Sequence, residues 1–273
     1  MRIIAPIPNV HPTAIVQGDI DLASDAEIGP HCVLTGPITV GPGTRLLGNV
    51  YLQGPMTLGA NNTIYPFACL GFAPQHARFD PRSPGEGLVI GDDNTFREHV
   101  TIHRAFTEAG PTRIGDRNVF MASSHAGHDC QVGSDCTFAN GAALGGHVTV
   151  ADRVVVGGGS LVHQFCRIGL GAMLSGGIGM KADVPPFFML TGINICGAVN
   201  MIGLRRSGMP SDQIEDVRWV YKTLYRRGRS PRDALMELKK RSERPLIADY
   251  IAFIESSERG YCPAHGKAAM GTA

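Results

Sequence analysis

The sequence predicts a parallel β-helix followed by a small helical domain. Aliphatic residues recur every six positions over most of the chain up to Met180, and a period of six is not that of an α-helix. Glycine often follows the aliphatic residue, as tight turns with unusual φ angles require. After Met180 this period stops and helical spacing begins. The first two observations predict the β-helix, and the third predicts the helical domain.

The six-residue repeat runs in three blocks. The first block has eleven consecutive aliphatic residues: Val10, Val16, Leu22, Ile28, Leu34, Val40, Leu46, Leu52, Leu58, Ile64 and Leu70. The second comprises Ile90, Phe96 and Ile102, and the third Ile114, Phe120, Ala126, Val132, Phe138, Leu144, Val150, Val156, Val162, Ile168, Leu174 and Met180. Three short strands make one triangular coil of about 18 residues, and the inward side chains of successive coils stack. The repeat predicts about nine to ten such coils.

Two interruptions of the repeat predict loops that leave the prism. Near residues 71–87 the phase slips by two and Pro, Gly and charged residues are frequent. Near residues 104–113 the phase is kept, but Glu108 stands where an aliphatic residue is due. Loops that project from a rigid scaffold often carry function. We divide the chain into a β-helix over residues 1–187, a helical domain over 188–260 and a tail over 261–273 that we expect to be disordered.

The helical domain carries three helical signals and a positive charge. One helix follows Ser211, a second opens at Ser230–Pro231, and a third around Tyr250 stops before Gly260. Residues 201–273 contain 14 Lys and Arg against 9 Asp and Glu. This excess is too small to predict nucleic-acid binding, although it suits an acidic protein partner or phosphate groups. A solvated helical surface is the alternative.

The cysteines and the apolar stretches indicate the cytoplasm. Seven cysteines without CxxC spacing argue against a disulfide framework and against a zinc knuckle. No signal peptide is visible at the start of the sequence. The stretch Val184–Leu204 has no charged residue until Arg205, but its prolines and asparagines argue against insertion into a membrane. We expect no integral membrane segment.

A histidine cluster on the later coils is the candidate for chemistry. His103, His125, His128, His147 and His163 fall within 61 residues. Because one coil is about 18 residues, Gly146 is expected directly over His128, and Gln164 one coil further. An imidazole base near an uncovered backbone N–H provides the two groups needed for acyl transfer from a thioester. Asp129 could hold the tautomer of the neighbouring base.

Other interpretations of these histidines stay open. They could form structural hydrogen bonds at coil corners in a non-enzymatic scaffold. His125, His128 and His147 could bind zinc across a trimer interface, as in a zinc-dependent trimeric hydratase. Asp129, the Gly145–Gly146 step and the basic helical extension argue against the zinc interpretation.

Five motifs resemble the bacterial UDP-N-acetylglucosamine O-acyltransferases. They are His125-Ala-Gly-His128-Asp129-Cys130, Gly145-Gly146-His147-Val-Thr-Val, Val162-His163-Gln164-Phe165-Cys166, Asp183-Val-Pro-Pro-Phe187 and Gly203-Leu204-Arg205-Arg206. The likeness runs from about Val10 to Gly260 with the same order of motifs. The His-x-x-His-Asp-Cys element is specific, whereas the bare six-residue repeat is not.

The resemblance implies a fold and a reaction. It implies a left-handed β-helix and a homotrimer with active sites between subunits. It also implies transfer of a 3-hydroxyacyl group from acyl carrier protein to the 3-hydroxyl of UDP-N-acetylglucosamine, in lipid A biosynthesis, without a cofactor or metal. By position, His128 would be the general base, Asp129 would orient it and the Gly146 N–H would stabilise the oxyanion.

The resemblance also implies substrate contacts, with one departure. The residues implied to line the site are His125, His147, His163 and Gln164. Arg206, with Arg205, is implied to meet the nucleotide phosphates, and Asn200 and Gln164 are implied to lie near the donor arm. Gly176 occupies the position that measures acyl length. A glycine there predicts a long acyl chain. The family's loop usually reads Gln-Asp-Leu-Lys at the sugar, whereas this chain has Gln75-His76-Ala77-Arg78. The lost acid leaves open a 3-amino UDP-sugar acceptor that gives an amide, or a related hexapeptide sugar N-acyltransferase.

Overall fold

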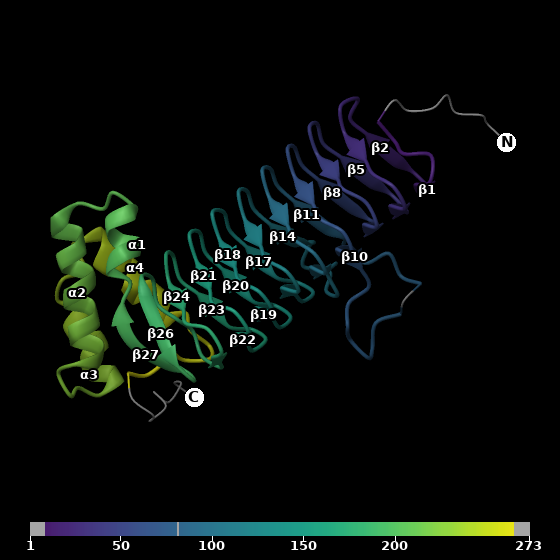
Figure 1. Cartoon of the computed structure of the whole chain (residues 1–273). Coiled ribbons are helices and arrows are strands. Elements are labelled where there is room, and N and C mark those ends of the chain that lie inside the picture. Colours follow the sequence, from purple (N-terminus) through teal and green to yellow (C-terminus); the bar gives the residue numbers. More distant parts are fainter. Residues whose placement is uncertain (1–8, 81, 265–273) are drawn as a thin grey trace.

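The chain forms a triangular prism of stacked coils with helices packed against its C-terminal end (Figure 1). The computed structural model describes residues 9–264 apart from residue 81. In this part of the chain the coils form three sheets of nine, eight and ten strands, in agreement with the nine to ten coils predicted. We call these sheets the first, second and third faces, and each edge is named by the two faces that it joins.

The strands of each face are short and lie one coil apart. The first face comprises β1 (Ile15–Gln17), β4 (Val33–Thr35), β7 (Tyr51–Gln53), β10 (Cys69–Phe72), β13 (Thr101–His103), β16 (His125–Ala126), β19 (Ala143–Leu144), β22 (Leu161–Val162) and β25 (Gly179–Met180). The second comprises β2 (Ile20–Leu22), β5 (Ile38–Val40), β8 (Met56–Leu58), β11 (Leu88–Ile90), β14 (Thr112–Ile114), β17 (Gln131–Val132), β20 (Thr149–Val150) and β23 (Arg167–Ile168). The third comprises β3 (Glu27–Ile28), β6 (Arg45–Leu46), β9 (Thr63–Ile64), β12 (Thr95–Phe96), β15 (Val119–Phe120), β18 (Thr137–Phe138), β21 (Val155–Val156), β24 (Met173–Leu174), β26 (Phe188–Gly192) and β27 (Ile195–Val199).

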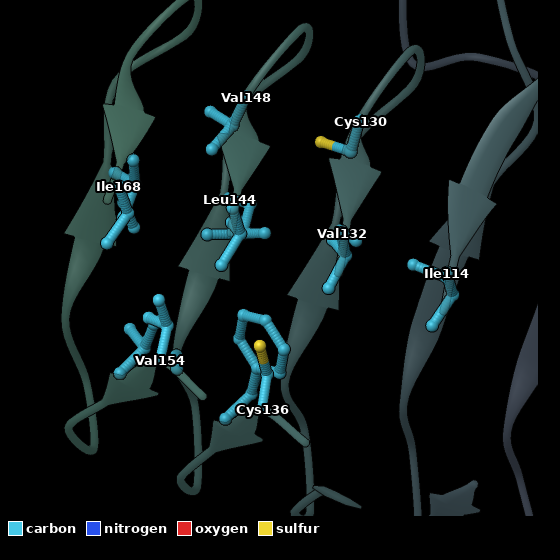
Figure 2. Packing of buried hydrophobic residues seen from close by; sticks show 14 of the residues in the cluster. Ile114, Cys130, Val132, Cys136, Leu144, Val148, Val154 and Ile168 are labelled. Carbon is cyan, nitrogen blue, oxygen red and sulfur yellow. The ribbon is translucent and has the colours of Figure 1, made fainter. Parts of the chain in front are cut away.

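The six-residue repeat supplies the core of the prism. Its members from Ile28 to Met180 are buried, and each stacks on its counterpart one coil away (Figure 2). Phe96, Phe120 and Phe138 form a continuous stack, with ring centroids 5.3 and 4.3 Å apart. Val16 in the first strand is 39% exposed. Among the described residues no strand of the first face precedes β1, so its side chains are less shielded than those of later coils.

Strand pairing shows where both loops leave the prism. His125 pairs with Ala143, 18 positions later, which is the normal coil. Cys69 instead pairs with Thr101, 32 positions later, and Thr101 pairs with His125, 24 positions later. The additional residues lie between β10 and β11 and between β13 and β14. Both loops therefore project from the first–second edge, on the two coils that precede His128.

The C-terminal part differs from the predicted division in two places. The prism does not stop at residue 187, because β26 continues the third face in parallel with β24 and β27 then turns back against it. The residues just after 260 are not a disordered tail: Tyr261 is 6% exposed, and Cys262 is fully buried and donates its backbone N–H to the Asp183 carbonyl. Backbone hydrogen bonds to the last coil hold this segment in place. Residues 265–273 of the predicted tail lie outside the described residues.

Within residues 9–264, four helices follow the prism. They are α1 (Met201–Arg206), α2 (Ser211–Tyr225), α3 (Pro231–Lys239) and α4 (Pro245–Glu255). The last three lie where helical spacing predicts them, whereas the short α1 carries no amphipathic signal and was missed. No described helix has the length and apolar content that a bilayer span needs. The uncharged stretch Val184–Leu204 instead forms the β26–β27 hairpin and part of α1.

Candidate active site

His128 and Asp129 occupy the turn between β16 and β17, at the first–second edge. Asp129 has a φ of 60°, which aspartate tolerates better than most residues. His128 is 9% exposed but does not belong to the apolar core of the prism. Its ring instead meets the rings of His76, Phe106 and His147 edge-on, at centroid distances of 5.7, 5.7 and 5.1 Å. The imidazole therefore points out of the prism, towards the two loops that project from the same edge.

Asp129 holds His128 in one tautomer. His128 Nδ1 lies 2.5 Å from Asp129 Oδ2. The same oxygen accepts the backbone N–H of Phe106, and Oδ1 accepts the N–H and hydroxyl of Thr107. An ionised carboxylate can only accept hydrogen bonds, so His128 carries its proton on Nδ1. Nε2 keeps its lone pair for a reacting group.

The surroundings of Asp129 keep it ionised. Burial by itself raises the pKa of this carboxyl group. The hydrogen bonds donated by His128, Thr107 and Phe106 outweigh burial, and they hold the pKa well below its ordinary value. Asp129 is therefore a permanent acceptor that orients the histidine and can stabilise an imidazolium.

Gly146 lies against the His128 ring, as the 18-residue spacing predicts. A Cβ built on Gly146 would stand 2.7 Å from Cε1 and 2.8 Å from Nε2 of His128. Its neighbours Gly145 and His147 donate their backbone N–H groups to Val162 and His128 carbonyls. The Gly146 N–H has no acceptor among the described residues. The absent side chain thus leaves space beside the His128 ring, at a residue whose main-chain N–H has no described acceptor.

The first loop brings His76 over the site. The His76 ring stacks on Phe106 with centroids 4.3 Å apart. Its Nδ1 lies 3.2 Å from the backbone N of Arg78 and accepts that N–H, so the remaining nitrogen, Nε2, carries the hydrogen. Gln75 and Arg78 are exposed on the same loop. The loop therefore presents the N–H of His76 at the site and carries the exposed cation Arg78, whereas the pattern that the chain resembles has an acid and a lysine at these positions.

The other histidines surround this centre. His147 stacks on Phe165 at 4.5 Å, and its Nε2 is 3.7 Å from Asp129 Oδ2. His125 Nδ1 is 2.8 Å from the Thr101 hydroxyl. Burial, together with the nearby His103 and His128, lowers the pKa of His125 to about 4, and burial also lowers the pKa of His147. Both rings are therefore neutral at pH 7 and act as hydrogen-bonding groups rather than as cations.

A cation site was the competing interpretation of the histidines. Nitrogen and oxygen atoms of His128, Asp129 and His147 all lie within 4.8 Å of one another, but His125 is not part of this group. Both oxygens of Asp129 already accept two hydrogen bonds each. A metal ion would have to displace these donors, so the carboxylate suits the orientation of His128 better than the coordination of a metal.

The remaining predicted contacts lie on different edges of the prism. Exposed Gln164 follows Gly146 by one coil on the first–second edge, with exposed His163 before it. Gly176 lies on the third–first edge, between β24 and β25. Asn200 and Arg206 line a cavity of about 840 Å³ with Asp135, Arg153 and Gly171, at the second–third edge. Within one chain His76 and His147 contact the His128 ring, and Gln75 and Arg78 share the loop of His76. Gly176, Asn200, Arg205 and Arg206 lie away from this edge.

Asn200 has a structural use that the sequence did not predict. Its side-chain oxygen accepts the Gly203 N–H and so caps α1, and its amide donates to the Gly171 carbonyl at 3.0 Å. These bonds orient the start of the helix that carries exposed Arg205 and Arg206. Asn200 thus positions the two arginines by fixing the start of their helix.

Sequence reasoning missed Phe106 and Thr107. Both lie in the predicted second loop, and they supply the backbone and hydroxyl donors that surround Asp129. The only signal was the departure from the repeat at Glu108. It marked the loop, but it did not indicate which residues of the loop face the site.

Comparison with known proteins gives one consistent family. Residues 183–262 match the family model described as UDP-N-acetylglucosamine O-acyltransferase, domain 2. The acyl-acyl-carrier-protein–UDP-N-acetylglucosamine O-acyltransferase of Halorhodospira halophila is 42% identical over 254 residues, covering 92% of this chain and 98% of that protein. The protein of the same name from Janthinobacterium is 43% identical over 260 residues, with the same coverage.

Solved structures agree with the sequence comparison. The UDP-N-acetylglucosamine acyltransferase of Francisella novicida superposes with a TM-score of 0.89 at 33% identity, covering 93% of this chain and 94% of that chain. The UDP-N-acetylglucosamine O-acyltransferase of Moraxella catarrhalis gives a TM-score of 0.87 at 36% identity, with 93% and 99% coverage. The similarity therefore extends over the prism and the helices together.

Proposed function

This chain belongs to the UDP-N-acetylglucosamine O-acyltransferase family, and from that premise we propose how its residues perform the reaction. The enzyme moves a 3-hydroxyacyl group from acyl carrier protein to the 3-hydroxyl of UDP-N-acetylglucosamine, in lipid A biosynthesis. The observation that carries the proposal is the hydrogen bond of His128 to Asp129 on one side of its ring, with Gly146 packed against the ring on the other.

The geometry supports a general-base mechanism. His128 Nε2 takes the proton of the sugar hydroxyl as its oxygen attacks the thioester carbonyl carbon. The oxyanion that forms accepts the Gly146 N–H. When this intermediate collapses, the carbon–sulfur bond breaks and the imidazolium returns the proton to the thiolate of the carrier. Asp129 keeps the ring oriented and stabilises its positive charge during the step.

The acceptor is contacted from the first loop. In this proposal Nε2–H of His76 and the guanidinium of Arg78 contact the sugar nucleotide, since arginine suits phosphate. His76 stands where a family acid would accept a hydrogen bond from the sugar. This difference leaves open a second candidate, in which a 3-amino UDP-sugar is the acceptor and the product is an amide.

An acyl-transfer assay tests the proposed function. Purified protein is mixed with 3-hydroxyacyl carrier protein and either UDP-N-acetylglucosamine or its 3-amino analogue. We expect a product mass increased by one acyl group, and mild hydroxylamine distinguishes the labile ester from the stable amide. A set of acyl chain lengths tests whether Gly176 leaves room for a long chain. Absence of transfer to both sugars would overturn the proposal.

A homotrimer with sites between subunits explains the separated contacts. His128 and Arg206 lie on different edges of one prism, so one bound UDP-sugar can reach both only if the edges of two copies meet. Closed rotational symmetry repeats the same contact at each interface. The outer side chains of the first face include Leu161, which is 60% exposed, and an apolar side chain of this kind suits such an interface.

Subunit mixing tests the shared site. We expect His128→Ala and Arg206→Ala trimers to be nearly inactive separately. After denaturation and joint refolding in equal amounts, random pairing leaves about a quarter of the sites intact, so about a quarter of wild-type activity should return. The control mixes His128→Ala with Gly146→Ala, whose lesions lie on the same edge of one chain, and should restore nothing. A site contained within one chain would give no recovery in either mixture.

Two further properties belong to the proposal. We expect no metal or cofactor, since the hydrogen bonds around Asp129 already use the oxygens that a cation would need. We also retain the cytoplasm as the location, because all seven cysteines are free thiols, as suits a reducing compartment. The acyl carrier protein then delivers the donor, and the basic helical domain is the surface that suits its acidic charge.

A further inference from the structure

Arg104 is a buried cation whose acceptors are all neutral. It is 2% exposed. Its guanidinium donates to the side-chain oxygen of Gln53 and to the carbonyls of Gly71 and Ser83, at 3.2, 3.0 and 3.0 Å. Burial of a charge is costly unless hydrogen bonds compensate it. The cation therefore depends on these carbonyl oxygens.

The two carbonyls come from opposite ends of the first loop. Gly71 is where the chain leaves β10, and Ser83 is where the loop returns towards β11. Between them, the Phe79 ring lies 5.6 Å from the Arg104 guanidinium carbon. Gln53 belongs to the coil beneath. One planar group thus joins both ends of the loop, one of its aromatic side chains and the prism.

The residues beside Arg104 connect the same loop to the catalytic centre. His103 Nδ1 donates to the Ala73 carbonyl, 2.6 Å away. The Ala105 N–H donates to the Gly87 carbonyl. Phe106 then stacks on His76 and gives its N–H to Asp129. Within the segment His103–Thr107, the first residues therefore contact the first loop, and the last residues contact the Asp129–His128 pair.

We propose that Arg104 is a positioning residue for the acceptor: it holds the first loop so that His76 and Arg78 face the sugar nucleotide. This role rests on the proposed function. The guanidinium gains its charge-assisted hydrogen bonds only while both ends of the loop are in place. Without Arg104 the loop loses its common anchor, whereas the pairing of His128 with Asp129 keeps its own donors.

Kinetics and proteolysis test this role together. Arg104→Met removes the donors and keeps most of the length of the side chain. We expect the KM for the UDP-sugar to rise about 10- to 100-fold, as misplaced positioning groups cause, with little change in kcat or in the KM for acyl carrier protein. Trypsin reports on the loop itself, because Arg82 is exposed there. The rate of cleavage after Arg82, measured by mass spectrometry, should increase by at least the same factor as the KM.

Two variants keep the test decisive. Arg45→Met removes an exposed arginine from the third face and should change neither readout. Arg104→Lys keeps the charge but lacks the planar fork of the guanidinium, so its KM for the UDP-sugar should also be raised. If Arg104→Met does not fold, Arg104→Lys replaces it in both measurements. Unchanged loop cleavage in a folded Arg104 variant would overturn the proposal, as would a kcat loss that equals or exceeds the rise in KM. Cleavage needs no turnover, so this readout stands even if the proposed function fails.

Discussion

Replacing His128 with alanine is expected to lower kcat for acyl transfer about 10²–10⁴-fold, the usual contribution of a general base. The imidazole lies outside the apolar core, so the fold and its thermal unfolding should change little. His128 is the only described ring hydrogen-bonded to Asp129. Initial rates with saturating donor and acceptor are the measurement, compared with the wild-type protein.

His11→Ala is a matched control for this variant. His11 is exposed just before β1, where its Nδ1 meets the Thr13 hydroxyl. Strand β1 lies far along the prism from β17, the strand that follows the His128–Asp129 turn (Figure 1). The His11→Ala variant should retain full activity. A His128→Ala enzyme with more than a tenth of wild-type kcat would exclude this histidine as the base, and His147, the next imidazole at the site, would be examined instead.

Replacing Gly146 with alanine should lower kcat about 10²–10³-fold, as much as the loss of an oxyanion donor does, because the alanine keeps its backbone N–H but its methyl group displaces either that donor or the base. The added methyl group would stand less than 3 Å from the His128 ring, so either the ring or the main chain must move. Binding of the UDP-sugar, which can be followed by calorimetry, should change much less than turnover. The substitution separates substrate binding from the stabilisation of the oxyanion.

A second glycine provides the control for Gly146→Ala. Gly192 ends β26, and a Cβ there meets Ile195 at ordinary contact distances of 3.6 and 3.7 Å. Gly192→Ala should therefore keep its activity. If Gly146→Ala were as active as Gly192→Ala, the main chain at this turn would not take part in the reaction, and the proposed oxyanion site would be wrong.

The alignment of Gly146 with His128 could be predicted because a coil of 18 residues relates distance along the sequence to distance in space. Parallel pairing with a register of 18 residues leaves little freedom, so Gly146 had to lie over His128. The loops follow no such rule. Their two starting points were visible as breaks in the repeat, but the stacking of His76 on Phe106 and the bonds from Thr107 to Asp129 depend on how two separate insertions pack together.

Prediction from the sequence was limited in the same way in the C-terminal part of the chain. The helix after Ser211 has an apolar face and was predicted, whereas the short α1 depends on its Asn200 cap and on packing against the last coil. Cys262 was expected in a disordered tail because the segment has no periodic pattern. Its burial results from backbone hydrogen bonds to Asp183, a partner about 80 positions away in the chain.

The amino-acid sequence alone determined the prism, the stacking of its core and the vertical alignment of His128 with Gly146, because a strict local period specifies a regular solenoid. Tertiary structure decided which loop residues surround Asp129, how Arg104 joins the two ends of the first loop, and that Arg206 lies on a different edge from His128. These features depend on contacts between segments that no period relates, so only the folded chain brings them together.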